Sequence, residues 1–306
     1  MVKCFGYKFF QKVIDACKLW SKVSFIQRSF SVIFVGNLYR MFKDKVIAIT
    51  GGSGGIGKAL VEEFLKKGAK VSTCARNNLQ LENLKKDHSE SSLFTVVGDV
   101  SKEGDCKNFI EQTIAQFNGI DIVINNAGIS MRALFKDTDL ATLRNLMETN
   151  FWGSVYCTKY ALDSILERKG SIVSVSSIAG YRGLPGRSGY SASKFALNGW
   201  MEALRTELLH TGVNVLWVCP GFTTSNIRNV ALNKDAQPQG ESPMDESKMM
   251  SSEECATHII NAIAKRKRTL VLTFTGKQTV YMNRFLPSWS DKLVHNFFFK
   301  NGQLVK

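Results

Sequence analysis

Two side chains in the second half of the sequence have the types and the spacing to move a proton together. Tyr190 and Lys194 stand four residues apart in the segment Tyr-Ser-Ala-Ser-Lys, so a helix would place both on one face. A free phenol has a pKa near ~10 and is a poor base at neutral pH. A neighbouring ammonium stabilises the phenolate and lowers that pKa toward working pH. Because this spacing is common on helices, the pair needs support from the rest of the chain.

A glycine cluster nearer the start of the sequence could bind phosphate. The apolar run 46–50 leads into Thr50-Gly-Gly-Ser-Gly-Gly-Ile-Gly57, and an amphipathic stretch follows at once. Glycines there let the chain turn tightly, let the backbone approach a pyrophosphate and let the helix pack on the strand. The helix N-terminus then presents free N–H groups to the phosphates. A tight turn between strand and helix would also explain the glycines, but their place on a first strand favours a dinucleotide site.

These residues must be positioned by a regular alternation of strands and helices. Apolar strands that alternate with helices indicate a parallel sheet covered on both faces, and right-handed crossovers wind it in both directions. We therefore expect a single-domain α/β Rossmann-type doubly wound parallel sheet of about seven strands. The predicted strands are 46–50, 69–74, 93–97, 121–125, 171–175, 213–218 and 270–273, and the longer predicted helices are about 102–117, 139–168 and 188–211.

The glycine spacing Gly51-x-x-x-Gly55-x-Gly57 after Thr50 resembles the Thr-Gly-x-x-x-Gly-x-Gly pattern of the short-chain dehydrogenase/reductase family. The resemblance spans about residues 45–275 and continues in chain order through Asp99-Val100, Asn125-Asn126-Ala127-Gly128, Asn150, Ser177, Tyr190 with Lys194, and Pro220-Gly221. It implies an oxidoreductase, of the kind acting on CH–OH donors, that moves a hydride between a nicotinamide dinucleotide and a carbonyl or secondary alcohol.

The resemblance also implies a role for each site residue. Tyr190 would exchange the proton with the substrate oxygen, and Lys194 would tune it and bind the nicotinamide ribose. Ser177 would donate to the same oxygen, and Asn150 would anchor a water that links Lys194 to solvent. Ser176 competes with Ser177, which is preferred for its thirteen-residue separation from Tyr190. The expected cofactor-binding residues are Thr50, Gly51, Ser53, Gly55, Ile56, Gly57, Arg76, Asp99, Val100, Asn126, Ala127, Gly128, Tyr190, Lys194, Pro220, Gly221 and Thr223.

The end of the second predicted strand bears on which dinucleotide is used. A carboxylate there would hold a ribose 2′-hydroxyl, whereas a guanidinium would pair with a 2′-phosphate. The sequence reads Cys74-Ala75-Arg76-Asn77 and has no acid at this place. NADP(H) is therefore favoured over NAD(H), although Arg76 could instead be a solvated loop residue and Gly54 is not the basic residue often found before Gly55.

The charge and the cysteine usage narrow the classes of function. The net charge is +14, and residues 1–42 hold seven basic residues and one acid, which is 7 − 1 = +6 of that total. No nucleic-acid-binding motif accompanies the charge, so we expect no nucleic-acid partner. Seven dispersed cysteines without a Cys-x-x-Cys pair and four separated histidines predict neither disulfides nor a metal site. A cytoplasmic protein is expected.

The ends of the chain differ from its middle. Residues 1–42 are basic and aromatic, and their longest uncharged apolar run, 30–36, is too short to span a bilayer. They form either a basic amphipathic segment for membrane or organelle targeting or a non-functional extension before a start at Met41, and we favour the extension. Residues 276–306 form an aromatic, basic tail that either rests on a membrane surface or packs on protein, and packing is preferred.

The sequence leaves the substrate open. Residues 222–250 would form either a mobile lid over an apolar ligand or a surface loop, and a capped helix from Ser251 would follow. The segment 126–135 resembles the member-7-like branch of the family, whose relatives are membrane-associated and act on lipophilic carbonyls. A homodimer or homotetramer is expected, with helices 139–168 and 188–211 at the interface. The alternative function is a silent NADP(H)-binding sensor or scaffold.

Overall fold

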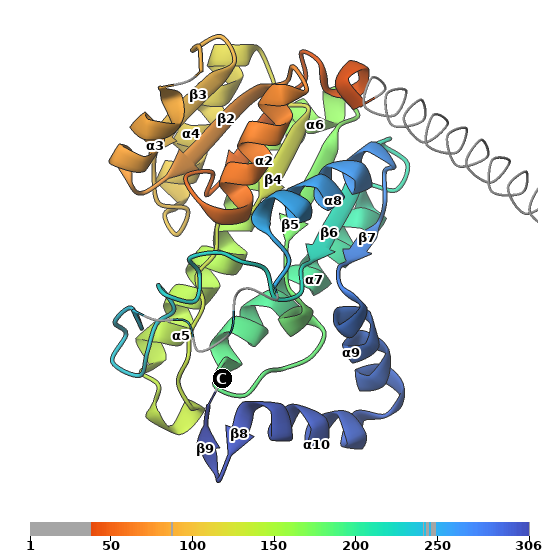
Figure 1. Ribbon diagram of the computed structural model, residues 1–306. Coiled ribbons are helices and arrows are strands. Elements are labelled where there is room, and N and C mark those ends of the chain that lie inside the picture. Colours follow the sequence, from red (N-terminus) through yellow and green to blue (C-terminus); the bar gives the residue numbers. More distant parts are fainter. Residues whose placement is uncertain (1–37, 87, 241, 243–244, 246–248, 306) are drawn as a thin grey trace, which may run out of the picture.

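A sheet of seven parallel strands runs through the molecule in the order β3-β2-β1-β4-β5-β6-β7 (Figure 1). The computed structural model describes residues 38–86, 88–240, 242, 245 and 249–305. Most of the predicted N-terminal segment 1–42 therefore lies outside the described residues. The strands are β1 (Val46–Thr50), β2 (Lys70–Ala75), β3 (Leu93–Val97), β4 (Ile122–Asn125), β5 (Ser171–Val175), β6 (Asn214–Cys219) and β7 (Thr269–Val271). The predicted doubly wound Rossmann-type sheet is confirmed.

Helices cover both faces of the sheet because each strand alternates its side chains between two cores. In β1, Ile47 and Ile49 belong to one core, and Val46 and Ala48 belong to the other. The first core is closed by α2 (Gly55–Lys66), α3 (Asn78–Lys85) and α8 (Ser252–Ala264). The second is closed by α4 (Glu103–Phe117), α6 (Gly153–Glu167) and α7 (Ser188–Glu207).

The single helix predicted over 139–168 is interrupted. The structure has α5 (Leu140–Met147), a π-helical turn over Glu148–Trp152 and then α6. Asn150 lies in this turn with no exposed surface, and its side-chain amide exchanges two hydrogen bonds with the backbone of Ile129. Such turns place one extra residue in a helix and occur most often at functional sites. Periodicity alone did not reveal the interruption.

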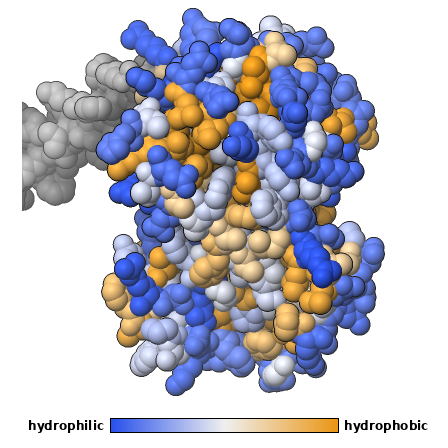
Figure 2. All heavy atoms as spheres, turned by 180° about the vertical axis from the view of Figure 1, so that it is seen from behind, coloured by the Kyte–Doolittle hydropathy of each residue, from blue (hydrophilic) through white to orange (hydrophobic). Residues whose placement is uncertain are grey.

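The chain reverses its direction of winding between β1 and β4. From β1 the chain continues to β2 and β3 on one side, and from β4 it continues to β5, β6 and β7 on the other. A crevice therefore opens between the carboxyl ends of the adjacent strands β1 and β4. From behind, the surface shows a broad upper lobe and a smaller lower lobe joined at a narrower waist (Figure 2). The upper lobe holds the sheet, and the lower lobe holds α5, α9 (Phe274–Phe285) and α10 (Pro287–Phe298).

The predicted C-terminal tail is folded against the body. After α10 the chain forms a hairpin of β8 (Phe299–Lys300) and β9 (Gln303–Leu304). The segment just before α7 receives this tail, since Arg182 pairs with Asp291 and a Cβ added to Gly186 would lie 2.5 Å from the Leu304 side chain. Within the described residues, no helix has the length and apolarity needed to cross a bilayer.

Candidate active site

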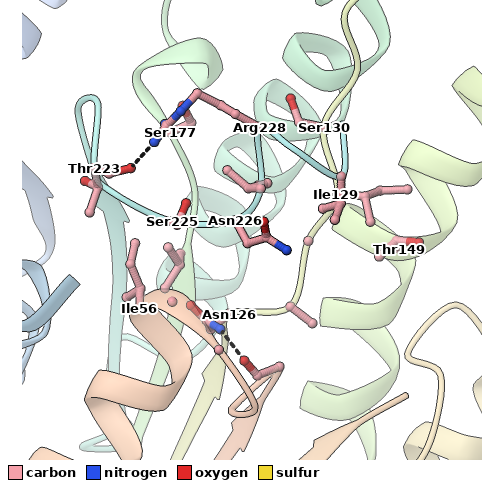
Figure 3. A pocket seen from close by; sticks show the side chains of 18 of the residues that line it. Ile56, Asn126, Ile129, Ser130, Thr149, Ser177, Thr223, Ser225, Asn226 and Arg228 are labelled. Carbon is pink, nitrogen blue, oxygen red and sulfur yellow. Dashed lines mark hydrogen bonds between the residues drawn. The ribbon is translucent and has the colours of Figure 1, made fainter. Parts of the chain in front are cut away.

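A cleft of about 420 Å³ lies where the carboxyl ends of the strands meet. Figure 3 shows it between the first turn of α2 and a loop that follows β6. The predicted site residues that line it are Gly51, Ser53, Gly55, Ile56, Arg76, Asp99, Val100, Asn126, Ala127, Gly128, Ser177, Tyr190, Lys194, Pro220, Gly221 and Thr223. The remaining predicted residues, Thr50, Gly57 and Asn150, do not line it.

The turn between β1 and α2 consists mainly of glycines, so no side chains fill the space beside its backbone. Gly51 and Gly55 have positive φ angles of 71° and 52°, which favour glycine. A Cβ on Gly57 would lie 2.2 Å from the Gly51 carbonyl oxygen, so only glycine allows α2 to start this close to β1. Among the described residues no side chain caps the N-terminus of α2, so its first N–H groups have no side-chain partner there.

Thr50 and Asn126 support the cleft from behind. The Thr50 hydroxyl oxygen accepts hydrogen bonds of 3.0 Å from the backbone N–H groups of Asn126 and Ala127. The Asn126 side-chain amide donates back to the Thr50 carbonyl at 3.0 Å, and Figure 3 shows Asn126 beside the first turn of α2. These bonds fix the end of β1 against the end of β4. Thr50 is thus placed as a support for the turn.

The phenol of Tyr190 faces the cleft in the first turn of α7. Burial is the largest influence on it and raises its pKa above the ordinary value, while a hydrogen bond with Ser177 and the charge of Arg187 act in the opposite direction. Ser177 follows β5, and its hydroxyl oxygen also accepts a 3.1 Å bond from the Ala179 N–H. The structure thus brings Ser177 and Tyr190, which the family resemblance pairs, close together.

Lys194 lies with its ammonium between the end of β5 and the ring of Tyr190. Its ammonium donates a 2.9 Å hydrogen bond to the Val175 carbonyl and lies 5.8 Å from the centroid of the Tyr190 ring. It is 4% exposed, and burial lowers its pKa to about 8. In the structure, the groups that lower the pKa of Tyr190 are Ser177 and Arg187. The influence of Lys194 on the phenol stays a prediction.

Asn150 stands directly behind the floor of the cleft. Its side-chain amide donates to the Ser193 hydroxyl at 2.9 Å, which joins the π-helical turn to α7. A Cβ on Gly128 would lie 3.1 Å from the Asn150 amide oxygen and 3.6 Å from the Lys194 ammonium. Asn150, Gly128 and Lys194 therefore meet at one place, which a larger residue at 128 would fill.

The loop after β6 covers the cleft. Thr223 accepts a 3.0 Å hydrogen bond on its carbonyl from the guanidinium of Arg228, and Figure 3 shows both above the cleft. Ser225 lies close to the glycine turn. A Cβ added to Gly55 would lie 3.3 Å from the Cβ of Ser225. Backbone hydrogen bonds between Leu232 and residues 130–132 hold the continuation of this loop.

Several residues that line the cleft were not expected from the sequence. Arg187 immediately precedes α7 and is 7% exposed, and Arg228 in the loop after β6 is 8% exposed. The signal for Arg187 was its place one helical turn before Tyr190, on the same face as Lys194. No local pattern marked the others, which include Ile129, Ser130, Thr149, Leu184, Phe222, Asn226, Ile227 and Val230.

The sequence is similar to known proteins over nearly its whole described length. The profile of the short chain dehydrogenase family matches residues 45–236. Dehydrogenase/reductase SDR family member 7B of Mus musculus is 31% identical over 294 residues, covering 90% of each chain. The 11-beta-hydroxysteroid dehydrogenase 1A of Arabidopsis thaliana is 34% identical over 287 residues, covering 89% of this chain and 80% of the relative.

Solved structures agree with the fold. A short-chain dehydrogenase from Streptomyces avermitilis superposes with a TM-score of 0.71 at 25% identity, covering 84% of this chain and all of the other. A short-chain dehydrogenase/reductase from Burkholderia phymatum, solved in complex with NAD, has the same TM-score at 21% identity over 81% of this chain and 95% of the other. The chain belongs to the short-chain dehydrogenase/reductase family of oxidoreductases, whose reactions interconvert CH–OH groups and carbonyls.

Proposed function

We propose that this protein transfers a hydride between NADP(H) and a carbonyl or secondary alcohol, with Tyr190 as the general acid and base. One observation carries the proposal. The glycine turn that could bind a dinucleotide and the group of Ser177, Tyr190 and Lys194 line a single cleft. A bound cofactor and a substrate oxygen could therefore be held in contact.

The residues of the cleft suit a nicotinamide dinucleotide. The uncapped start of α2 and the glycines of the turn form a cradle that a Cβ would fill, which fits a pyrophosphate. When bound, the cofactor supplies or accepts the hydride. Arg76, exposed at the end of β2, would pair with a 2′-phosphate, and this supports NADP(H) over NAD(H). Asp99 and Val100 would border the adenine side, and Thr223 the nicotinamide side.

The chain's own groups would then move the proton. During reduction, the Tyr190 hydroxyl donates its proton to the substrate oxygen as negative charge develops there, while the Ser177 hydroxyl donates a hydrogen bond to the same oxygen. A pKa raised by burial keeps the phenol protonated, which supports the reductive direction. Lys194 would bind the nicotinamide ribose, and Asn150 would hold a water that joins Lys194 to solvent.

The walls of the cleft support a substrate with a lipophilic body. Apolar side chains of Ile129, Leu184 and Phe222 line the cleft, and the loop after β6 would act as a lid over them. Relatives whose names specify 11-beta-hydroxysteroid dehydrogenase point in the same direction. We propose that the lid comprises about residues 222–250 and that the catalytic domain comprises residues 43–275.

Exposed aromatic side chains support the assembly that was predicted. Trp152 and Phe195 are 40% and 46% exposed on the π-helical turn and α7, where two protomers would meet in a homodimer or homotetramer. On the tail, Phe285 and Trp289 are both 69% exposed, which supports peripheral contact of a cytoplasmic protein with a membrane.

Replacing the phenol tests the function. Tyr190→Phe should lower the turnover of lipophilic ketones, followed by NADPH oxidation, by about a hundredfold or more, since a positioned general acid contributes roughly 10²–10⁴. NADPH binding, followed by nucleotide fluorescence, should persist. Tyr160→Phe is the matched control, because Tyr160 is on α6 and hydrogen-bonds to Glu103 outside the cleft. Tight NADPH binding without turnover of any carbonyl by the unchanged protein would instead favour a sensor or scaffold.

A further inference from the structure

Arg187 is a buried cation in the wall of the cleft. It immediately precedes α7, and only 7% of its surface is exposed. It lines the cleft together with Leu184 and Tyr190. Residues three apart in a helical turn are neighbours, so the guanidinium lies on the same side of the helix as the proposed general acid.

The guanidinium of Arg187 makes no hydrogen bond or ion pair with the part of the chain that the structure describes. Its side-chain contact is with Phe298 of the tail, whose ring centroid lies 5.6 Å from the guanidinium carbon. A ring covers the face of a guanidinium and leaves the N–H donors in its plane available. Because leaving a buried charge unpaired is costly, these donors call for an anion.

The charges around Arg187 increase this need. Burial is the largest influence that lowers the pKa of Arg187. Arg132 and Arg228 act in the same direction, and Tyr190 acts against them. The Nε atom of Arg132 is itself buried without a hydrogen-bond partner among the described residues. Arg228, in contrast, donates to the Thr223 carbonyl and to Ser242. Besides the phenol of Tyr190, the charged side chains of the described residues that act on Arg187 are these two arginines, and neither offers it an acceptor.

We propose that the substrate carries an oxyanion, a carboxylate or a phosphate, which Arg187 binds while Tyr190 exchanges the proton with the carbonyl oxygen. The planar guanidinium presents paired N–H donors that match either group, and Arg132 adds attraction over a longer range. Apolar side chains of Ile129, Leu184 and Phe222 line the same cleft. An amphiphilic oxo acid or oxo phosphate therefore fits the cleft better than a neutral ketone does. This inference rests on the proposed function and adds the charge of its substrate.

Pairs of substrates that differ in charge and by one methyl group test the inference. The full-length enzyme is assayed with NADPH and aliphatic oxo acids of increasing length, each beside its methyl ester, and with phosphate monoesters of the corresponding hydroxyketones. The unchanged enzyme should prefer an anion over the ester by at least about tenfold in kcat/KM, mainly through KM. The acid and phosphate arms show which oxyanion is used.

The variant Arg187→Met should abolish this preference, whereas Arg187→Lys should retain part of it. The ratio of anion to ester activity is the decisive quantity, because an effect of Arg187 on the proton of Tyr190 changes both substrates alike. Arg205→Met is the matched control. Arg205 is on α7 and, like Arg187, faces an aromatic ring, with 4.5 Å to the Trp217 centroid, but it does not line the cleft. It should keep the preference of the unchanged enzyme.

A binding measurement separates this inference from the proposed function. Oxo acids added to the enzyme–NADP⁺ complex should raise the melting temperature of the unchanged protein, and not that of Arg187→Met. Turnover of ketones and esters without any preference for anions would overturn the charge of the substrate and leave the reaction intact. Stabilisation by anions without turnover would instead overturn the reaction. Equal losses for anion and ester in Arg187→Met would overturn the role of Arg187 in binding the oxyanion.

Discussion

The two ends of the cleft are built by different means. The end at the glycine turn consists of backbone and small residues, with Gly51 and Gly57 in contact and Thr50 tied to Asn126. The end at Tyr190 gathers arginines and apolar side chains from a loop, from the start of α7 and from the tail. We call these the nucleotide end and the substrate end. The first is fixed by close backbone packing at the ends of two adjacent strands and can serve one cofactor, whereas the second depends on side chains from a loop and the tail and can vary.

The largest effect on NADPH binding is expected at Gly57, where the nucleotide end has no space for a side chain. Gly57→Ala should abolish NADPH binding or lower it by more than about tenfold, since its Cβ would lie 2.2 Å from the Gly51 carbonyl oxygen. Gly54→Ala is the control, because nothing lies within 4 Å of a Cβ at position 54. It removes a glycine from the same turn without creating a close contact. Thermal unfolding and nucleotide fluorescence check both variants. Equal damage in the two would show that the turn is not set by close packing.

A smaller effect is expected at the exposed rim of the nucleotide end. Arg76→Ala should raise the KM for NADPH by about tenfold, because a charge-assisted hydrogen bond to the 2′-phosphate is lost. The KM for NADH should stay within about twofold, which makes NADH the internal control. Steady-state kinetics with both cofactors measure the change. An unchanged ratio of the two KM values would leave Arg76 as a solvated loop residue.

The buried ammonium between the two ends should make stability depend on pH. Burial lowers the pKa of Lys194 from 10.5 to about 8, so between these values the unfolded chain binds more protons than the folded one. The contribution of Lys194 to the free energy of unfolding should therefore rise with pH between about 8 and 10.5, by at most about 1.4 kcal/mol per pH unit. This contribution is lost as the pH falls through 8.

Urea unfolding across this pH window measures that gain. Lys194→Met should lack the rise that the unchanged protein shows, and every other titrating group contributes to both proteins alike. Lys159→Met supplies the control, because Lys159 is exposed on α6. Parallel pH profiles for the unchanged protein and Lys194→Met would mean that the ammonium is better solvated than its 4% exposure indicates.

The smallest effect is expected where the tail meets the substrate end. Phe298→Leu removes the ring that faces Arg187 while it keeps an apolar side chain, so kcat/KM for carbonyl substrates should change by about two- to fivefold. NADPH affinity should be unaffected. Phe285→Leu, on an exposed side chain of α9, is the control. A change in NADPH affinity with Phe298→Leu would break the division between the two ends.

The same division explains what the sequence could predict. The seven strands, the glycine turn and the union of Ser177 with Tyr190 follow from local periodicity and from fixed spacings. Residues such as Arg76 could be placed at a strand end for the same reason. Their positions depend on a few neighbouring residues and on the common geometry of parallel sheets.

Features that arise from long-range packing could not be predicted. The π-helical turn at Asn150 depends on hydrogen bonds to Ile129, which lies twenty-one residues earlier in the chain. The direction of the Lys194 ammonium depends on the Val175 carbonyl at the end of another element. The charge at Arg187 becomes apparent only when Arg132, Arg228 and Phe298 are brought beside it. No periodicity or motif encodes such contacts.

The contact between the terminal hairpin and Gly186 has a consequence for how such enzymes diverge. Leu304 fills the space beside Gly186, just before the helix of Tyr190, although more than a hundred residues separate the two in the chain. Exchange of this hairpin between paralogues would reshape one wall of the site while the nucleotide turn stays intact. Recombination at the tail thus offers evolution, and the protein engineer, a way to change the substrate without changing the cofactor.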